Sequence, residues 1–462
     1  MNSVRWLMGV FVWALTALVS TELTTSRAAE VAGLDDYVKL KDASYSWKLS
    51  KKTDVPLLGT MHEMDLVSQT WQGLNWTHKL VIYDGTSGSV KPKTMLLMNT
   101  GGAPSTGNNY IGFTLAKKVG APIAVLYGIP NQPLYDGKKE DALIAETMVR
   151  YLEGGGKDGS WPLLFPMVKS VVRSFDALGA YTEKEWGAKV DSFVLTGASK
   201  RGWTTWLTAA VEPRVKGFAP MVIDVLNMKP QMDHQLVTLG AFSQMIHDYT
   251  ERKLLPMPEG DLALKLWKMV DPYSYRDRYK QPKLIVNGAN DPYWTVDALN
   301  LYWDEIPGPK WVEIVANAGH NLSPLTREGK QTEPTIALDA VAAFTRRIAA
   351  GSSLPTVTWK QSFAEGAGIV DVVASEDVKV ARVWQACSET RDFRKSRWEM
   401  TELKGGPREF RRKVEPCEGK NTAYYVEVEF ADKTGANFRL ATQIRVIDSK
   451  GIELRPKAVA SK

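Results

Sequence analysis

Between residues 94 and 350 the chain alternates short apolar runs with segments whose apolar residues recur at helical spacing. A short, almost fully apolar run is typical of a strand buried on both faces, and a period of about 3.6 is typical of an amphipathic helix. The expected strands cover residues 94–102, 122–127, 191–198, 215–224, 282–288 and 311–315. One expected helix ends at residue 119, and the others cover residues 140–152, 166–178, 202–212 and 333–350. This order predicts an α/β fold, in which helices cover a mostly parallel sheet.

Two flanking regions show other patterns. Residues 71–83 alternate β-branched and aromatic residues with polar ones, which predicts antiparallel strands at one edge of the sheet. Residues 225–280 have helix-like patterns that are rich in Met, Tyr and Trp. This second region is expected to be either a helical cap over a substrate or plain helical packing on the sheet.

The last part of the chain is expected to form a separate β domain over residues 356–450. Residues 351–355 are a linker by composition, and short runs that alternate apolar and polar residues follow them. Seven or so strands in about 95 residues predict an immunoglobulin-like β-sandwich. The only two cysteines of the chain, Cys387 and Cys417, lie in this domain, and we expect them to form a disulfide.

The first 28 residues are typical of a secretory signal peptide. Arg5 precedes an apolar run from Trp6 to Val19, and the small residues around Ala28 suit a cleavage site. A membrane anchor is the alternative, but an apolar run of about 14 residues is short of the roughly 20 that span a bilayer. We therefore expect a periplasmic or secreted protein, with the α/β domain covering residues 29–350.

The expected strand 191–198 leads through a tight turn into a helix at Ser199, and the turn reads G-A-S-K-R-G from Gly197 to Gly202. An α/β-hydrolase places its nucleophilic serine on such a strand-to-helix turn, which needs small neighbours and offers a helix N-terminus to an oxyanion. The usual pattern is G-x-S-x-G, and here Arg201 stands where the second glycine belongs. The alternative is a buried serine in an ordinary strand-to-helix connection.

Acyl transfer by serine also needs a histidine base and an acid that fixes the tautomer of that base. In an α/β-hydrolase the serine is followed along the chain by the acid and then the histidine, each just past a strand. Asp291 and His320 occur in that order, after the expected strands 282–288 and 311–315. The sequence therefore predicts a triad of Ser199, Asp291 and His320, with Asp224 as the rival acid.

Other residues are expected around this triad. The oxyanion hole is predicted at the backbone N–H of Lys200 and at an N–H of the paired glycines Gly101 and Gly102. Lys200 and Arg201 add positive charge near the oxyanion or an anionic substrate group. In the alternative, Arg201 pairs with a core carboxylate and stiffens the elbow. Two aromatic residues near the turn and the acid either line the site or pack the core: Trp203 and Trp294.

Composition and charge narrow the function further. Hydrophobic residues make up 44% and charged residues 24% of the 462 residues, which is ordinary for a soluble globular protein. A net charge of +6 does not argue for nucleic acid, and we expect none as a partner. The five histidines are scattered and no nucleotide-binding motif occurs, so we expect neither a metal nor a cofactor. Basic residues gather at 391–397 and 408–413, either as a solvated face or as a site for an anionic envelope surface.

Several motifs resemble the PhoPQ-activated pathogenicity-related proteins. They lie at residues 71–78, 130–134, 161–167, 197–211 and 220–227, and the run around Ser199 is highly specific. The resemblance covers most of residues 36–350. It implies an exported α/β-hydrolase-fold protein that is linked in some bacteria to resistance against cationic antimicrobial peptides. The elbow is also similar to that of glucuronoyl esterases, in which an arginine follows the serine where this chain has Lys200.

Together these features predict an exported serine hydrolase, most simply an esterase that acts on small-molecule or glycan esters. A secreted binding or signalling protein that keeps the fold without catalysis is the alternative from another class. A serine peptidase is a third.

Overall fold

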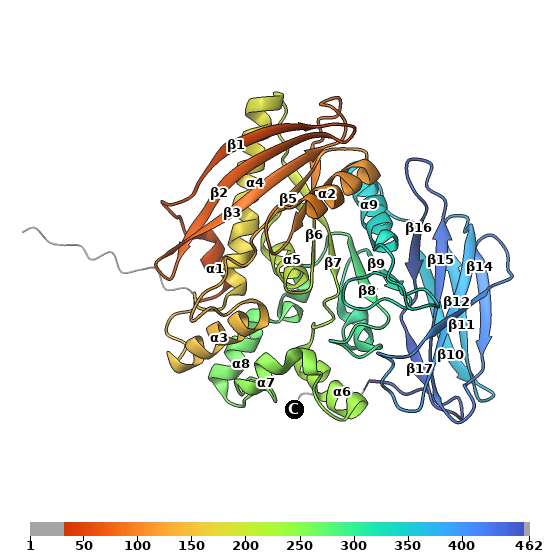
Figure 1. Ribbon diagram of the computed structural model, residues 1–462. Coiled ribbons are helices and arrows are strands. Elements are labelled where there is room, and N and C mark those ends of the chain that lie inside the picture. The colour runs from red at the N-terminus through yellow and green to blue at the C-terminus, as the bar shows by residue number, and fades with distance from the viewer. Residues whose placement is uncertain (1–31, 457–462) are drawn as a thin grey trace, which may run out of the picture. The chain divides into compact units, whose positions relative to one another are not determined.

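The computed structural model describes residues 32–456, and the predicted signal peptide lies outside this range. Strands β1 to β9 form one sheet in the order β1-β2-β3-β5-β4-β6-β7-β8-β9 (Figure 1). β1, β2, β3 and β5 pair antiparallel at one end, whereas the strands from β5 through β9 pair in parallel. The strands are β1 Ser46–Val55, β2 Gly59–Trp71, β3 Leu74–Asp84, β4 Thr94–Asn99, β5 Ile123–Leu126, β6 Ser192–Ala198, β7 Val215–Met221, β8 Lys283–Gly288 and β9 Lys310–Val315. This confirms the prediction of a mostly parallel sheet.

The central strands are buried on both faces, as their apolar runs predicted. Every residue of β5 is buried, and in β6 neighbouring residues point into two different cores, Val194 into one and Leu195 into the other. β1 differs, because most of its side chains are exposed. It therefore has no apolar alternation, and the sequence predicted antiparallel strands only at residues 71–83. The structure adds β1 and a long β2 to that edge.

Helices cover both faces of the sheet (Figure 1). The first face carries α1, α4 and α5, and the second carries α2 and α9. These helices are α1 Leu34–Lys39, α2 Thr106–Val119, α4 Leu164–Trp186, α5 Lys200–Val211 and α9 Thr335–Ala349. α4 continues well past the predicted end at residue 178, because Tyr181 and Thr182 extend its buried side. A further helix, α3 (Glu140–Glu153), precedes α4.

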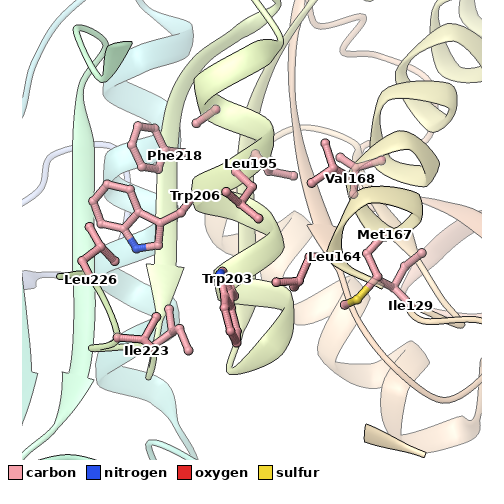
Figure 2. Packing of buried hydrophobic residues seen from close by; sticks show 14 of the residues in the cluster. Ile129, Leu164, Met167, Val168, Leu195, Trp203, Trp206, Phe218, Ile223 and Leu226 are labelled. Atoms are coloured by element: carbon pink, nitrogen blue, oxygen red, sulfur yellow. The ribbon is translucent and has the colours of Figure 1, made fainter. Parts of the chain in front are cut away.

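The helix that follows the predicted elbow, α5, is buried along most of its length. Figure 2 shows Trp206 of α5 beside Phe218 and Leu226, with Leu164 and Val168 of α4 on the other side of the helix. The rings of Trp206 and Phe218 lie 5.0 Å apart, edge to face. Packing on both sides holds the first turn of α5 in place against the sheet.

The chain between β7 and β8 is helical, as its pattern predicted. It contains α6 Met228–Leu239, η1 Gln244–Ile246, α7 His247–Glu251, α8 Asp261–Val270 and η2 Pro272–Arg278. Asp271 joins the two ends of this segment, because its carboxylate accepts hydrogen bonds from the N–H groups of Asn227 (3.2 Å), Met228 (2.8 Å) and Tyr273 (2.9 Å). Two short 3-10 turns, η3 Ala298–Leu301 and η4 Trp303–Glu305, lie between β8 and β9.

The C-terminal strands form separate antiparallel sheets. One has the order β10-β11-β14 and the other β13-β12-β15-β16, with β17 also paired to β15. The strands are β10 Val357–Ala364, β11 Ala367–Ala374, β12 Val380–Ser388, β13 Trp398–Glu402, β14 Glu409–Val414, β15 Asn421–Phe430, β16 Phe438–Ala441 and β17 Arg445–Ile447. A disulfide joins Cys387 to Cys417, whose Cα atoms lie 6.0 Å apart. The β-rich character agrees with the prediction, and the immunoglobulin-like topology stays a prediction.

The second of these sheets packs on the end of the central sheet. β16 lies against β9, and the hydroxyl of Tyr425 donates a hydrogen bond to the carbonyl of Ile314 (3.1 Å). Within residues 32–456, none of the helices is both long and apolar enough to cross a membrane.

Candidate active site

Ser199 occupies a strained turn between β6 and α5. Its φ of 58° and ψ of −127° lie in a region that residues with a Cβ rarely adopt, at a cost of about 1–3 kcal/mol. Two main-chain hydrogen bonds hold the turn: Ser199 N–H donates to Met221 O, and Trp203 N–H donates to Ser199 O, each at 2.9 Å. This backbone conformation is the one expected of a nucleophile elbow.

Two glycines let α5 approach the sheet at this turn. A Cβ on Gly197 would lie 2.4 Å from Asn99 Nδ2, and a Cβ on Gly202 would lie 2.7 Å from Ile223 Cγ2 and 2.9 Å from Met221 O. Neither position has room for a side chain. Gly202 therefore allows the close approach for which the usual pattern G-x-S-x-G has its second glycine. Because Gly202 lies one residue after that position, the position itself can hold the long side chain of Arg201.

The structure brings Asp291 and His320 together. His320 Nδ1 lies 2.8 Å from Asp291 Oδ2, and Asp291 Oδ1 accepts the N–H of Tyr293 at 2.9 Å. The Tyr293 ring stacks on the His320 imidazole with centroids 4.2 Å apart. The hydrogen bond to Asp291 and the stacking on Tyr293 both restrict the orientation of the His320 imidazole.

The other imidazole nitrogen, His320 Nε2, is buried and has no hydrogen-bond partner within residues 32–456. Ser199 Oγ therefore makes no hydrogen bond to it in this described part of the chain. Such bonds are often long in free enzymes and shorten when substrate binds. Nε2 is thus the free basic nitrogen that the predicted role of His320 requires.

The rival acid, Asp224, lies near Asp291 but bonds to other partners. Asn287 Nδ2 donates to Asp224 Oδ2 at 2.9 Å, and the Tyr302 hydroxyl donates to Oδ1. Complete burial raises the pKa of Asp224 to about 7, against the effect of these two hydrogen bonds. Asp291, not Asp224, is the carboxylate hydrogen-bonded to His320.

The residues predicted for the oxyanion hole lie on both sides of the elbow. Lys200 is the first residue of α5, where backbone N–H groups have no acceptor within the helix. Gly101 and Gly102 follow β4, and Gly102 has a φ of 66°. A Cβ on Gly101 would lie 2.3 Å from Arg201 Nη2, so this turn contacts the elbow through Arg201.

The two cations of the elbow form ion pairs with two consecutive carboxylates at the start of α3. Arg201 makes two hydrogen bonds to Glu140, each of 2.7 Å, and Lys200 Nζ lies 2.7 Å from Asp141 Oδ2. Burial raises the pKa of Glu140, but the hydrogen bonds and charge of Arg201 outweigh it and lower that pKa to about 2. The Tyr249 hydroxyl also donates to Asp141, at 3.0 Å. Both cations are thus neutralised within the protein.

Sequence reasoning did not find these partners. Glu140 and Asp141 look like ordinary acidic residues of a first helical turn, where a negative charge interacts favourably with the helix dipole. Tyr249 and Tyr293 carry no motif. The path of the chain between β5 and α3 brings Glu140 and Asp141 to the elbow, and tertiary packing brings Tyr249 and Tyr293 there; no local pattern specifies either.

An apolar pocket opens beside Ser199. Residues of the helical segment 225–280 form much of its wall, and Trp203, Tyr293 and Trp294 also line it. The Trp203 indole donates to Val270 O at 2.7 Å, which fixes this side chain. Trp203 and Trp294 were expected either to line the site or to pack the core. Their position agrees with lining the site, and both side chains are also largely buried.

The C-terminal domain reaches the loop that carries Asp291. Asn290 Nδ2 donates to Ser396 O at 2.7 Å, and Arg394 Nη1 lies 3.4 Å from Pro292 O. Arg391 bonds to the buried carboxylate of Asp297 at 3.2 Å. Part of the basic cluster at 391–397 therefore supports this loop, whereas in the cluster at 408–413 Arg408, Arg411 and Lys413 form exposed ion pairs.

Three side chains of metal-ligating type cluster on α7. Within the described residues, His247, Asp248 and Glu251 bring three ligand atoms within 4.8 Å of one another on the surface of α7. Exposed acidic groups of this kind are common without an ion. The group takes no part in the geometry around Ser199.

Comparisons with known proteins agree with the sequence motifs. A family model described as PhoPQ-activated pathogenicity-related protein matches residues 34–394. Autocrine proliferation repressor protein A of Dictyostelium discoideum is 31% identical over 387 residues, which are 78% of this chain and 76% of that protein.

Among solved structures, acetyl xylan esterase 1 of a Thermoanaerobacterium species aligns with a TM-score of 0.43 and 15% identity, over 67% of this chain and 93% of that one. An S-formylglutathione hydrolase of Agrobacterium tumefaciens aligns with a TM-score of 0.41 and 16% identity, over 66% of this chain and 99% of that one.

Proposed function

The chain belongs to the family of PhoPQ-activated pathogenicity-related proteins, and from this premise we propose that it is an exported serine hydrolase that acts as an esterase. The observation that carries the proposal is the His320–Asp291 hydrogen bond together with a serine on a strained strand-to-helix turn. Tyr293 joins the two, because it stacks on His320 and lines the same pocket as Ser199. A serine that only packed the core would not need the positive φ of Ser199. Export rests on the predicted signal peptide.

Each residue has a defined role in the proposed reaction. Ser199 Oγ attacks the carbonyl carbon of the ester while His320 Nε2 takes its proton, and Asp291 holds the imidazole in the required tautomer. The N–H of Lys200, with one from Gly101 or Gly102, stabilises the tetrahedral oxyanion. His320 then gives its proton to the departing alcohol. Water, deprotonated by the same nitrogen, releases the acid from Ser199.

A non-catalytic signalling protein is the second candidate. The name of the Dictyostelium relative describes a repressor of proliferation, which is a signalling role. The missing hydrogen bond between Ser199 and His320 within the described residues also fits a protein that keeps the fold without catalysis. The family link to antimicrobial-peptide resistance supports a role at the cell envelope in either case.

Labelling with a fluorophosphonate probe separates the two candidates. We expect the folded protein to be labelled, the Ser199→Ala variant to lose the label, and the Ser274→Ala variant, altered at an exposed serine, to keep it. A His320→Ala variant should also lose it, because the serine would lack its base. Folded wild-type protein that takes no label would favour the signalling candidate.

A further inference from the structure

We propose that the substrate is a neutral ester with an apolar acyl group, and that the pocket beside Ser199 holds this group. The inference rests on the proposed esterase function and adds the substrate class to it. Three observations carry it: the chemistry of the pocket wall, the position of the pocket relative to His320, and the pairing of the cations around the elbow.

The wall of the pocket is apolar over most of its surface. Met228 and Met232 of α6 contribute to it together with Met257, Trp267 and Ile223. Methionine side chains are flexible and polarisable, so they adapt to chains of different shape. Such a wall gains free energy from each methylene it removes from water.

The position of the pocket indicates which half of the ester enters it. Ser199 lines the pocket, whereas His320 does not. His320 must protonate the departing alcohol, so the alcohol has to lie on the histidine side of Ser199. Tyr293 lines the pocket and stacks on His320, and therefore lies between the two sides. The acyl group of the ester therefore occupies the pocket.

The charges around the elbow disfavour an acidic substrate. Lys200 also lines the pocket, but its ammonium group is paired with Asp141, which lines the pocket too. Arg201 is paired with Glu140. A free carboxylate on the substrate would have to displace one of these partners, so an acidic ester is a poor fit and a neutral acyl chain is a good one.

A chain-length series tests the proposal on the whole protein. With p-nitrophenyl esters from acetate to octanoate, kcat/KM should rise about fourfold per added methylene until the pocket is full. Met232→Trp, which fills part of the pocket, should lower the ratio of octanoate to acetate turnover at least tenfold. Met400→Trp, the same substitution at an exposed position on β13, should leave that ratio unchanged.

A binding measurement separates failure of this inference from failure of the proposed function. In Ser199→Ala protein, methyl octanoate should change the fluorescence of the pocket tryptophans at concentrations where methyl acetate does not. Flat or falling kcat/KM with chain length in an active enzyme would overturn the acyl-pocket proposal and leave the esterase. Absence of hydrolysis together with octanoate binding would overturn the esterase and keep the pocket as an apolar ligand site. Absence of octanoate binding would overturn the pocket proposal.

Discussion

The guanidinium of Arg201 and the carboxylate of Glu140 form a two-pronged ion pair, with Nη1 2.7 Å from Oε2 and Nη2 2.7 Å from Oε1. Arg201 Nε also donates to Ile129 O at 2.5 Å. The pair ties the first turn of α5 to the first turn of α3, so the residue that departs from the usual elbow pattern has a structural partner. Of the two roles considered from the sequence, pairing with a carboxylate agrees with this geometry.

We expect Arg201→Ala to destabilise the protein by about 2 kcal/mol. The side chain of Arg201 is 11% exposed, but that of Glu140 is 40% exposed, so the loss should be smaller than for a fully buried pair. Urea unfolding at pH 7 measures it. Arg408→Ala, which removes an exposed ion pair with Asp377, is the matched control and should change the free energy of unfolding by less than about 0.5 kcal/mol. An Arg201→Ala protein of normal stability but weakened binding of acidic esters would instead assign Arg201 to the substrate.

The choice of acid is tested by comparing two carboxylates. Asp291→Asn should lower kcat by roughly 10⁴-fold, because an amide at this position favours the wrong imidazole tautomer. Asp224→Asn should have little effect on kcat, since Asp224 bonds to Asn287 and Tyr302 and not to His320. Steady-state hydrolysis of one ester by both variants decides it. The reverse result would move the role to Asp224.

The sequence predicted most of the sheet and the order of the candidate triad. Strands such as β5 and β6 were predictable because a strand buried on both faces must be apolar throughout. Ser199, Asp291 and His320 could be proposed from chain order alone, since parallel strands place their carboxyl ends at the same edge. β1 was not predictable, because an exposed edge strand needs no apolar face.

The surroundings of the triad were beyond sequence reasoning. Glu140 lies 61 residues from Arg201, and only the course of the chain between β5 and α3 brings the two together. The apolar pocket depends on the way helices of the segment 225–280 lie over Ser199, and a Met-rich pattern alone is equally typical of core packing. Local patterns specify elements, whereas these contacts depend on tertiary packing.

Asp224 should make the stability of the protein depend on pH. Its pKa rises from 3.8 to about 7 on folding, so the folded protein holds a proton that the unfolded chain releases between these values. The stabilising effect of this proton is complete below about pH 4 and is lost as the pH rises toward 7, a change of roughly 2–4 kcal/mol. Asp224→Asn should remove this part of the decline while keeping an oxygen that accepts the hydrogen bond from Tyr302. Unfolding free energies at pH 4.5 and 7.5 test it, and parallel pH profiles for the two proteins would contradict it.

The last prediction concerns Glu313, a fully buried residue of β9 where the central sheet meets the C-terminal sheet. Neither carboxylate oxygen of Glu313 has a hydrogen-bond partner within residues 32–456. Burial raises its pKa well above 4.5, and the nearby charge of Glu427 raises it further. Arg382 pairs with Glu427 at 2.8 Å, which leaves Glu313 as the carboxyl that stays protonated.

A raised pKa in the folded state means that stability is greatest below about pH 4.5 and falls as the pH rises, because the unfolded chain ionises first. Glu313→Gln keeps the shape and removes the charge, so this variant should gain stability over the wild type above pH 6, and the gain should grow toward pH 9. Glu399→Gln, at an exposed position on β13, is the control and should follow the wild type at every pH. Chemical unfolding at pH 5 and pH 8 distinguishes the outcomes. If the advantage of Glu313→Gln is the same at both pH values, the folded and unfolded states bind the same number of protons over this range, and the pKa of Glu313 is not raised by folding.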